Sequence, residues 1–391
     1  MKAPAPLNPT PRLLLGPGPS DAHPSVLRAM ATPLLGHLDP QFLELMNQVQ
    51  DMLRAAFLTS NGLTLPISAT GSAGMEACLV NLLEAGDRAV VCSKGYFGQR
   101  MVDMAQRLGT DLTVLEQTWG QVFDLNRIRE TLQRVRPKVL GIVHAETSTG
   151  AWQPIEQLGK LCHEFDTLLL VDAVTSLGCV PVRVDDWEID AIYSCSQKGL
   201  GCPPGLAPVS FSPRAVEVME KRKSRVPNWY LDLSAIRKYL GSDRVYHHTA
   251  PISMNYALHE GLRLVMEEGL EARWQRHLLN HRALKAGLQA MGLTYTAQEG
   301  HQLPQLNAVR IPTGVDDLAG RKFLLERFGI EVGGGLGDFK GKAWRIGLMG
   351  YNSRPAVVLV ALAALEQTLN HLGARVPAGA GVAAANAVFL G

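Results

Sequence analysis

The 391-residue sequence has no CxxC pair, no GxGxxG loop and no GxxxxGK loop. A CxxC pair is typical of zinc ribbons and thioredoxin-like redox sites, and the two glycine patterns are typical of dinucleotide and nucleoside-triphosphate sites. The spacing of the histidines does not match a metal-binding motif either. These absences argue against a metal centre and against the common nucleotide-binding enzymes.

Long apolar runs and an excess of one charge are also missing. No uninterrupted apolar stretch reaches the length of a membrane span, and the run of leucines at 13–15 is too short for a signal peptide. The formal net charge is only +2 with both signs mixed, so no basic stripe for nucleic acid is visible. The six cysteines lie mostly in apolar surroundings, which indicates free thiols in a reducing compartment. We expect a cytoplasmic protein that binds neither membranes nor nucleic acid.

Short apolar runs alternate with helical patterns through the middle of the chain. The runs expected to be buried strands are residues 88–92, 139–144, 167–172, 189–193 and 206–211. The helical patterns between most of them are residues 73–84, 98–108, 125–134 and 155–165. This alternation predicts an α/β fold with a mainly parallel central sheet flanked by helices.

The pattern changes near residue 253. Helical stretches at 253–268 and 272–291 precede expected strands at 306–311 and 343–348 and a helix at 355–371. We predict an N-terminal arm (1–20), a large domain (21–252), a smaller C-terminal α+β domain (253–375) and an Ala/Gly-rich tail (376–391). Composition alone predicts that the tail is flexible.

Lys198 follows an expected strand, within the segment SCSQKGLG at 194–201. An isolated lysine on a loop is most simply a surface residue. A lysine that forms a Schiff base needs small neighbours that let a ligand approach, and the neighbours here are small. The Pro-Pro-Gly at 203–205 predicts a rigid turn behind it.

Asp172 ends the wholly apolar run LLLVD at 168–172. Burying a carboxylate there is costly unless it has a partner. It either caps the following turn or faces a protonated ring nitrogen of a cofactor. Because Asp172 and Lys198 follow successive expected strands, both should lie at the carboxyl edge of one sheet, where α/β folds usually bind ligands.

Two further segments suggest anion binding. Thr70, Gly71 and Ser72 precede an apolar helix, whose N-terminal N–H groups suit a phosphate, although a plain helix cap explains them about as well. Arg345 lies in the apolar strand pattern AWRIG at 343–347. It would be costly there without an anion, which is either a structural ion-pair partner or a substrate carboxylate.

Together these residues resemble the class V aminotransferases of fold type I, and most closely the alanine–glyoxylate and serine–glyoxylate aminotransferases. The resemblance covers nearly the whole chain, from LLGPGPS at 14–20 to the end of WRIGLMG at 344–350. Its strongest further matches are TGSAGMEA (70–77), HAETSTG (144–150), LLLVDAVTSLG (168–178), SQKGL (196–200) and YHHTAP (246–251). The tail is also similar to the GVAAA tail of glyoxylate-using members, which counts against a flexible end.

The resemblance implies pyridoxal 5'-phosphate (PLP) as cofactor and assigns roles to residues. Lys198 would form the Schiff base and Asp172 would face the pyridine nitrogen. Arg345 would hold the substrate carboxylate. The other cofactor-binding residues that it implies are Thr70, Gly71, Ser72 and Gln197 near the phosphate, Phe97 stacked on the ring, Thr147 near the phenolic oxygen, and Tyr246 and Thr249 reaching the phosphate from the other subunit of a homodimer with shared sites.

Two positions depart from the vertebrate alanine–glyoxylate enzymes. The stacking residue, Trp there, is Phe97 here, and the His of their phosphate loop is Ser72 here. Phenylalanine can still stack and serine can still donate, so both roles remain physically possible. The departures bear on substrate preference.

The function expected on this basis is transfer of the amino group of alanine or serine to glyoxylate, which gives glycine and a 2-oxo acid. Two alternatives are another class V transaminase, such as a 2-aminoethylphosphonate–pyruvate aminotransferase, and a non-catalytic PLP-fold subunit. A phosphonate substrate would call for extra cationic groups, and the intact Lys198, Asp172 and Arg345 argue against a non-catalytic role.

Overall fold

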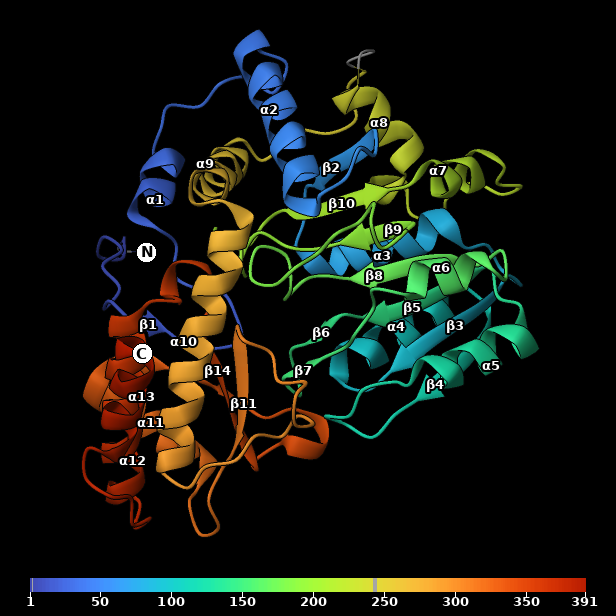
Figure 1. Ribbon diagram of the computed structural model, residues 1–391. Coiled ribbons are helices and arrows are strands. Elements are labelled where there is room, and N and C mark those ends of the chain that lie inside the picture. Colours follow the sequence, from blue (N-terminus) through green and yellow to red (C-terminus); the bar gives the residue numbers. More distant parts are fainter. Residues whose placement is uncertain (2, 242–244) are drawn as a thin grey trace.

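A seven-stranded sheet forms the centre of the larger part of the molecule, seen on the right in the computed structural model of Figure 1, which describes residues 1, 3–241 and 245–391. Its strand order is β2-β10-β9-β8-β5-β3-β4. The inner strands β9, β8, β5, β3 and the edge strand β4 run parallel, whereas β10 is antiparallel to both β2 and β9. The bounds are β2 Leu63–Ile67, β3 Arg88–Ser93, β4 Asp111–Glu116, β5 Val139–Val143, β8 Leu168–Asp172, β9 Ala191–Tyr193 and β10 Ala207–Phe211.

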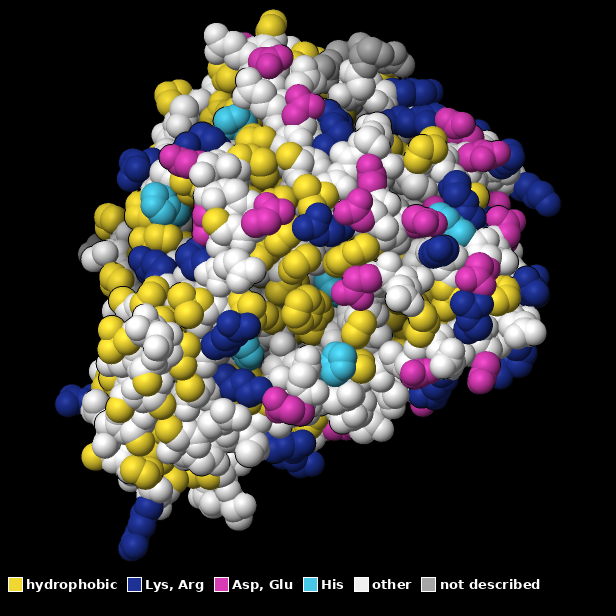
Figure 2. Space-filling model, viewed as in Figure 1, with side chains coloured by type: hydrophobic (Ala, Val, Ile, Leu, Met, Phe, Trp, Pro, Cys, Tyr) yellow, Lys and Arg dark blue, Asp and Glu magenta, His cyan; other side chains and the backbone are white. Residues whose placement is uncertain are grey.

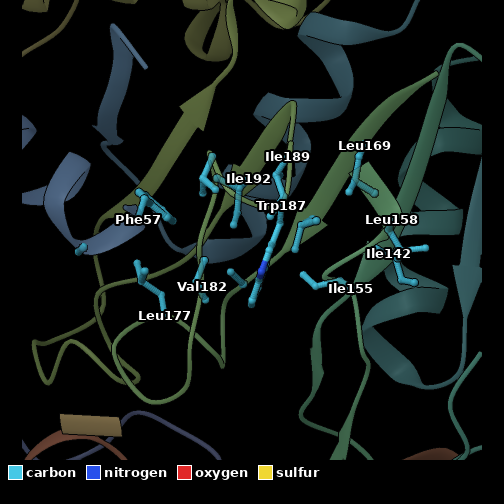
Figure 3. Close-up of a cluster of buried hydrophobic side chains, with 14 of the residues drawn as sticks. Phe57, Ile142, Ile155, Leu158, Leu169, Leu177, Val182, Trp187, Ile189 and Ile192 are labelled. Carbon is cyan, nitrogen blue, oxygen red and sulfur yellow. The ribbon is translucent and has the colours of Figure 1, made fainter. Parts of the chain in front are cut away.

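Helices cover both faces of this sheet because its central strands are apolar on both sides. In β8, Leu169 and Val171 join one core and Leu168 and Leu170 join the other, as the alternation of side chains along a strand requires. Figure 3 shows part of the first core, where Trp187 packs among aliphatic side chains. The helices of this region are α1 Pro24–Met30, α2 Pro40–Phe57, α3 Gly71–Leu82, α4 Tyr96–Arg107, α5 Leu125–Val135, α6 Leu158–His163, α7 Pro213–Glu220 and α8 Leu233–Leu240.

Local sequence signals set several helix starts. Asp39 caps α2, and its carboxylate accepts from Gln41 N at 2.8 Å, with Pro40 as the first helical residue. Asp124 caps α5 in the same way.

The predicted α/β arrangement is confirmed, because the central sheet is mainly parallel and helices flank it.

A three-stranded sheet, in the order β11-β14-β13, forms a second layer with the C-terminal helices. Figure 1 shows α10 running from α9 past this sheet, with α12 and α13 near it, and the two chain ends on the same side of the molecule. The two-residue strand β1 pairs parallel with β12, which fixes the N-terminal arm to this part of the chain. The bounds are β1 Leu13–Leu14, α9 Ile252–Glu268, α10 Leu270–Ala290, β11 Leu306–Arg310, α11 Asp317–Phe328, β12 Ile330–Glu331, β13 Gly333–Gly334, β14 Ala343–Gly347, α12 Pro355–His371 and α13 Ala380–Leu390.

The expected flexibility of the Ala/Gly-rich tail is wrong for its last residues, which form α13 against α10 and α12. Small side chains allow the helices to approach closely. A Cβ added to Gly287 of α10 would lie only 2.7 Å from the carbonyl oxygen of Gly381 in α13. Ala385 is fully buried in the same core. The many small residues of this tail therefore serve close helix packing and do not make the end mobile.

Most of the expected elements are confirmed, and two are shorter than predicted. The strand expected at 189–193 begins only at Ala191, because Ile189 N bonds back to Val184 O in a turn. The helix expected at 155–165 is α6, Leu158–His163. All six cysteines are buried and free, as predicted, and burial raises the pKa of each thiol.

The surface carries charges of both signs. Lysines and arginines lie interspersed with aspartates and glutamates over the face drawn in Figure 2. None of the helices in the described part of the chain has the length and apolar character needed to cross a membrane.

Candidate active site

Lys198 lies in a turn five residues after β9 and is only 7% exposed. The simpler expectation of a surface lysine is therefore wrong. Its Nζ donates to Pro17 O, and a Cβ added to Gly18 would meet its Cε at 2.6 Å. Gly18 has a φ of +118°, which also favours glycine. The segment that contains Pro17 and Gly18 thus covers the lysine side chain.

Asp172 is the last residue of β8, directly opposite Tyr193 of β9 in the parallel ladder. Its carboxylate, 2% exposed, accepts from Val174 N at 2.8 Å and from the Tyr193 hydroxyl at 2.7 Å. Asp172 therefore caps the turn that follows, and one of its oxygens is held by a second strand. Asp172 and Lys198 follow the carboxyl ends of neighbouring parallel strands, as the sequence predicted.

The segment of Thr70, Gly71 and Ser72 forms the start of α3 and packs against both of these strand ends. A Cβ on Gly71 would lie 3.0 Å from Cys195 Cβ and 3.1 Å from Val174 Cγ2, so the backbone approaches closely. Thr70 occupies the N-cap position, yet its side chain makes no capping hydrogen bond. Its side chain thus leaves the first N–H groups of α3 uncapped, which suits an anion.

Near this helix start one hydroxyl already accepts a hydrogen bond, and one amide oxygen has none. Ser72 Oγ accepts from Arg100 Nη1 at 2.8 Å. The Oε1 atom of Gln197, next to Lys198, is buried and has no hydrogen-bond partner among the described residues. A buried amide oxygen with a free acceptor position suits a polar ligand.

Phe97 lies in the first turn of α4, just after the carboxyl end of β3. The guanidinium of Arg100 lies over its ring, 4.9 Å from the centroid. The buried carboxylate of Glu146 accepts from Phe97 N at 3.4 Å and from Gly98 N at 3.2 Å. Ser148 Oγ accepts from Tyr96 N at 2.9 Å, so Glu146 and Ser148 together fix the start of this helix.

Thr147 lies between these two residues, after β5, and its hydroxyl is hydrogen-bonded to that of Thr175. Thr175 follows Asp172 by three residues. In the sheet order, β9, β8, β5 and β3 are consecutive neighbours. The strand ends that carry Lys198, Asp172, Thr147 and Phe97 are therefore adjacent along one edge.

Arg345 reaches this region from β14 and is 7% exposed. Its Nε donates to Gly334 O at 2.8 Å, and it forms no ion pair within the described part of the chain. The expected alternative of a structural ion pair is therefore not supported there. Burial lowers the pKa of Arg345 to about 10, although the nearby Glu146 acts in the opposite direction.

Burial also shifts the two central groups. It lowers the pKa of Lys198 to about 8, with the positive charge of Arg345 acting in the same direction and Asp172 opposing it. It raises the pKa of Asp172 to about 6, although the hydrogen bonds from Tyr193 and Val174 oppose the rise. A buried carboxylate and a buried amine are thus both destabilised in their charged forms until a partner is bound.

Tyr246 and Thr249 lie in a segment that approaches the start of α3 through their neighbour His248, whose ring is hydrogen-bonded to Ser68 Oγ at 2.7 Å. Tyr246 is 57% exposed, and its hydroxyl contacts that of Thr249 at 3.4 Å. Its ring lies beside that of His37. Their predicted role toward the phosphate stays a prediction that requires a second subunit.

The single-residue assignments missed several residues that hold the site together. Ser20 donates to Lys198 O at 3.0 Å through its hydroxyl and to Gln197 O at 3.0 Å through its backbone. Tyr193 binds Asp172, and Glu146 binds the first turn of α4 at Phe97. The GPGPS sequence at 16–20 was a visible signal for the first of these, because its dense glycine and proline predict a fixed, close-packed segment. Glu146 lies within the matched segment HAETSTG at 144–150, whereas Tyr193 lies in an apolar strand pattern that does not set it apart.

These residues fit PLP, the cofactor that the sequence resemblance implies. An uncapped helix start suits its phosphate, and a buried carboxylate that forms no ion pair with the described residues suits its ring nitrogen. A buried amine with a lowered pKa suits its aldehyde. The donor set of the described residues therefore matches the three chemical groups of this cofactor.

Comparison with known proteins gives a consistent result. The model of the family described as Aminotransferase class-V matches residues 20–355. An alanine–glyoxylate aminotransferase of Callithrix jacchus is 40% identical over 370 residues, which are 94% of this chain and 89% of the relative. The crystal structure of the ureidoglycine–glyoxylate aminotransferase of Bacillus subtilis has a TM-score of 0.97 at 40% identity and covers 99% of this chain and 100% of its own. That of an alanine–glyoxylate aminotransferase from Nostoc sp. has a TM-score of 0.93 at 53% identity, over 94% and 98% of the two chains.

Proposed function

The chain belongs to the class-V aminotransferases, and from that premise we propose that it transfers the amino group of a small amino acid to glyoxylate. The family and the fold type I architecture expected from the sequence are thereby confirmed, and the enzyme is a PLP-dependent aminotransferase. The relatives named above all carry glyoxylate in their names, whichever donor they use. This shared acceptor supports glyoxylate, and it does not favour the phosphonate transaminase or a non-catalytic subunit.

When bound, PLP supplies an aldehyde for amino groups and a ring that accepts electrons from the α-carbon of the substrate. Lys198 Nζ takes the proton from that α-carbon and delivers it again after the electrons have moved. Its low pKa keeps an appreciable fraction of the amine neutral, which is the form that can accept a proton. Asp172 holds a proton on the ring nitrogen, since a buried carboxylate favours a cationic neighbour.

The observation that carries the substrate proposal is the buried guanidinium of Arg345. It makes no ion pair in the described part of the chain, so its fork is available for one carboxylate. It also lies close enough to Lys198 to influence the pKa of that amine. A carboxylate held there orients the α-C–H bond of the donor relative to Lys198 Nζ.

A second, distal carboxylate on the donor would need a cation of its own or would be desolvated at a cost. The second arginine beside the described site residues, Arg100, already donates to Ser72 Oγ and lies over the ring of Phe97. We therefore favour donors with short, uncharged side chains, with alanine slightly ahead of serine. Glyoxylate, with its single carboxylate, meets the same requirement as an acceptor.

We also include (S)-ureidoglycine as a donor, because it appears in the name of the Bacillus subtilis relative whose structure matches with a TM-score of 0.97. The experiment is kcat/KM for alanine, serine, ureidoglycine, glutamate and 2-aminoethylphosphonate, each with glyoxylate and with 2-oxoglutarate. We expect glyoxylate to be preferred by every good donor. A tenfold or larger advantage for glutamate, for the phosphonate or for 2-oxoglutarate would contradict the proposal and leave the cofactor assignment intact.

We also propose a homodimer with shared sites, located in the cytoplasm. Large exposed apolar side chains lie in and beside the segment of Tyr246: Val245 (54% exposed), Tyr246 itself, and Trp229 (67%), whose ring stacks on that of His247. Such large exposed apolar side chains are costly in water and support an interface with a second copy. The buried free cysteines support a reducing compartment.

A further inference from the structure

Two backbone turns meet behind the candidate site. One follows Asp172 and contains Gly178, and the other contains Lys198 and Gly199. A Cβ added to Gly199 would lie 2.2 Å from Leu177 O and 2.6 Å from Cys179 Sγ. The two turns are therefore pressed together with space for little more than hydrogen atoms between them.

A single side chain from a distant helix joins these turns. Arg273, in the first turn of α10, is 5% exposed. Its Nε donates to Gly178 O at 2.8 Å, and its Nη2 donates to Gly199 O at 2.6 Å. The remaining nitrogen, Nη1, pairs with Glu268 at 2.6 Å. All three nitrogens of the guanidinium are thus used, two of them on the two turns.

The contact with Gly199 completes a set of fixed carbonyls around Lys198. The carbonyl of Gln197 accepts from Ser20 N, and that of Lys198 accepts from Ser20 Oγ and Gly201 N. With Arg273 on Gly199, three successive carbonyls are held by hydrogen bonds. The backbone of Lys198 therefore has little freedom, and the place of its amine depends on these bonds.

We propose that Arg273 is a positioning residue for transamination, which sets the distance between the Asp172 segment and Lys198 by holding both turns with one guanidinium. The inference rests on the proposed function, in which Lys198 moves the α-proton. Proton transfer depends steeply on the placement of the base. A lysine at 273 could not replace the arginine, because a single ammonium group lacks the planar fork that reaches both carbonyls.

Arg276, one turn further along α10, provides a matched control. It pairs with the same carboxylate, Glu268, and donates to Gly350 O at 3.0 Å and to Ser353 O. Among the described residues, Arg276 forms no hydrogen bond with the Lys198 turn and reaches it only through Gly350, which packs against Gly199. Replacing either arginine removes a partner of Glu268 and several backbone contacts, so both variants should lose thermal stability. Only the Arg273 variant should misplace Lys198.

The experiment compares Arg273→Ala, Arg273→Lys and Arg276→Ala as PLP-loaded enzymes with ordinary and α-deuterated alanine. We expect kcat to fall about ten- to a hundredfold in both Arg273 variants, with a larger deuterium isotope effect than in the wild type, because α-proton transfer becomes more rate-limiting. Arg276→Ala should keep the wild-type isotope effect. If all variants lose activity only in proportion to folded enzyme, with an unchanged isotope effect, Arg273 is a scaffold residue and the proposal is wrong.

A second readout uses the space beside the side chain. Arg273, Arg276 and Glu268 line a cavity of about 390 Å³. Guanidinium chloride at low, non-denaturing concentration can therefore reach the place vacated in Arg273→Ala, and we expect it to restore part of kcat, whereas sodium chloride should not. Failure of guanidinium to restore any activity in Arg273→Ala would count against a positioning role.

The outcome for Arg273 can be separated from the outcome for glyoxylate. The donor half of the reaction is followed in a single turnover, by the change in cofactor absorbance, without any 2-oxo acid present. If the wild-type enzyme does not use glyoxylate as an acceptor, only the proposed function is contradicted. The single-turnover isotope effect still decides the role of Arg273.

Discussion

The Tyr193 hydroxyl donates a 2.7 Å hydrogen bond to Asp172, so two neighbouring parallel strands jointly hold the carboxylate that we assign to the cofactor nitrogen. The bond favours the charged form of Asp172, whereas burial favours the neutral form and raises the pKa to about 6. The cofactor-free protein therefore contains a carboxylate that is only partly compensated. This imbalance has measurable consequences.

Replacing Asp172 with Asn should stabilise the cofactor-free protein at pH 8 and strongly reduce turnover of the PLP-loaded enzyme. Because folding raises the pKa of Asp172, its contribution favours the folded state below the ordinary pKa of 3.8 and is lost as the pH rises through about 6. Above that pH the unpaired charge costs on the order of 2–3 kcal/mol. Urea unfolding at pH 5 and pH 8 measures the difference, which should be larger at pH 8.

Tyr193→Phe provides the control for this prediction. It removes the hydrogen bond and keeps the carboxylate, so the cofactor-free variant should be less stable than the wild type at pH 8. Equal stability of wild type and Asp172→Asn at both pH values would show that Asp172 is not strained.

Lys198→Ala should abolish the borohydride-reducible link to the cofactor and steady transamination, because it removes the amine that forms the link. Lys94 is a demanding control, since it is fully buried and burial lowers its pKa to about 7. Lys94→Met should keep the link. Mass spectrometry of the reduced wild-type enzyme should find PLP on the peptide that contains Lys198, and PLP on Lys94 would refute the assignment.

The rate at which PLP binds covalently to the cofactor-free enzyme should rise with pH through about 8, because only the neutral amine of Lys198 reacts. Arg345→Met removes a positive charge that lowers this pKa, so the midpoint should move to higher pH. Stopped-flow absorbance at a series of pH values measures the midpoint. A midpoint that stays in place in the variant would show that Arg345 does not act on Lys198.

Mixed dimers should reveal shared sites. Lys198→Ala and a Tyr246→Phe/Thr249→Ala double variant should each be poorly active alone. A heterodimer of the two would contain one site with an intact Lys198 from one subunit and intact Tyr246 and Thr249 from the other. Co-expression with two affinity tags should therefore restore up to half of the wild-type activity per dimer, and no restoration would mean that each chain completes its own site.

The parts of the fold that the sequence predicted are those with a strong local signal. The strand LLLVD is buried on both faces, so an unbroken apolar run identified it. The strand β2, which contains Pro66, was missed, and the structure places it at the edge of the sheet, where proline is tolerated. The edge strand β4 was missed because only Leu115 of its residues is buried.

The site shows the same division. Lys198 and Asp172 could be placed together because their strands are adjacent in sequence and parallel. The role of Arg273 could not be predicted. Its guanidinium binds Gly178 and Gly199, which lie far upstream in the sequence, and the residues around the start of α10 give no sign of these contacts. Long-range contacts between a side chain and a backbone carbonyl leave no periodic trace in a sequence.

The cover of Lys198 has a consequence for synthesis of the protein. Pro17 and Gly18 emerge early from the ribosome, but their neighbours Leu13 and Leu15 bind Ile330 and Gly347, which emerge near the end. In a nascent chain, β1 therefore stays unpaired while the large sheet forms. Until translation is almost complete, the reactive lysine lacks its cover.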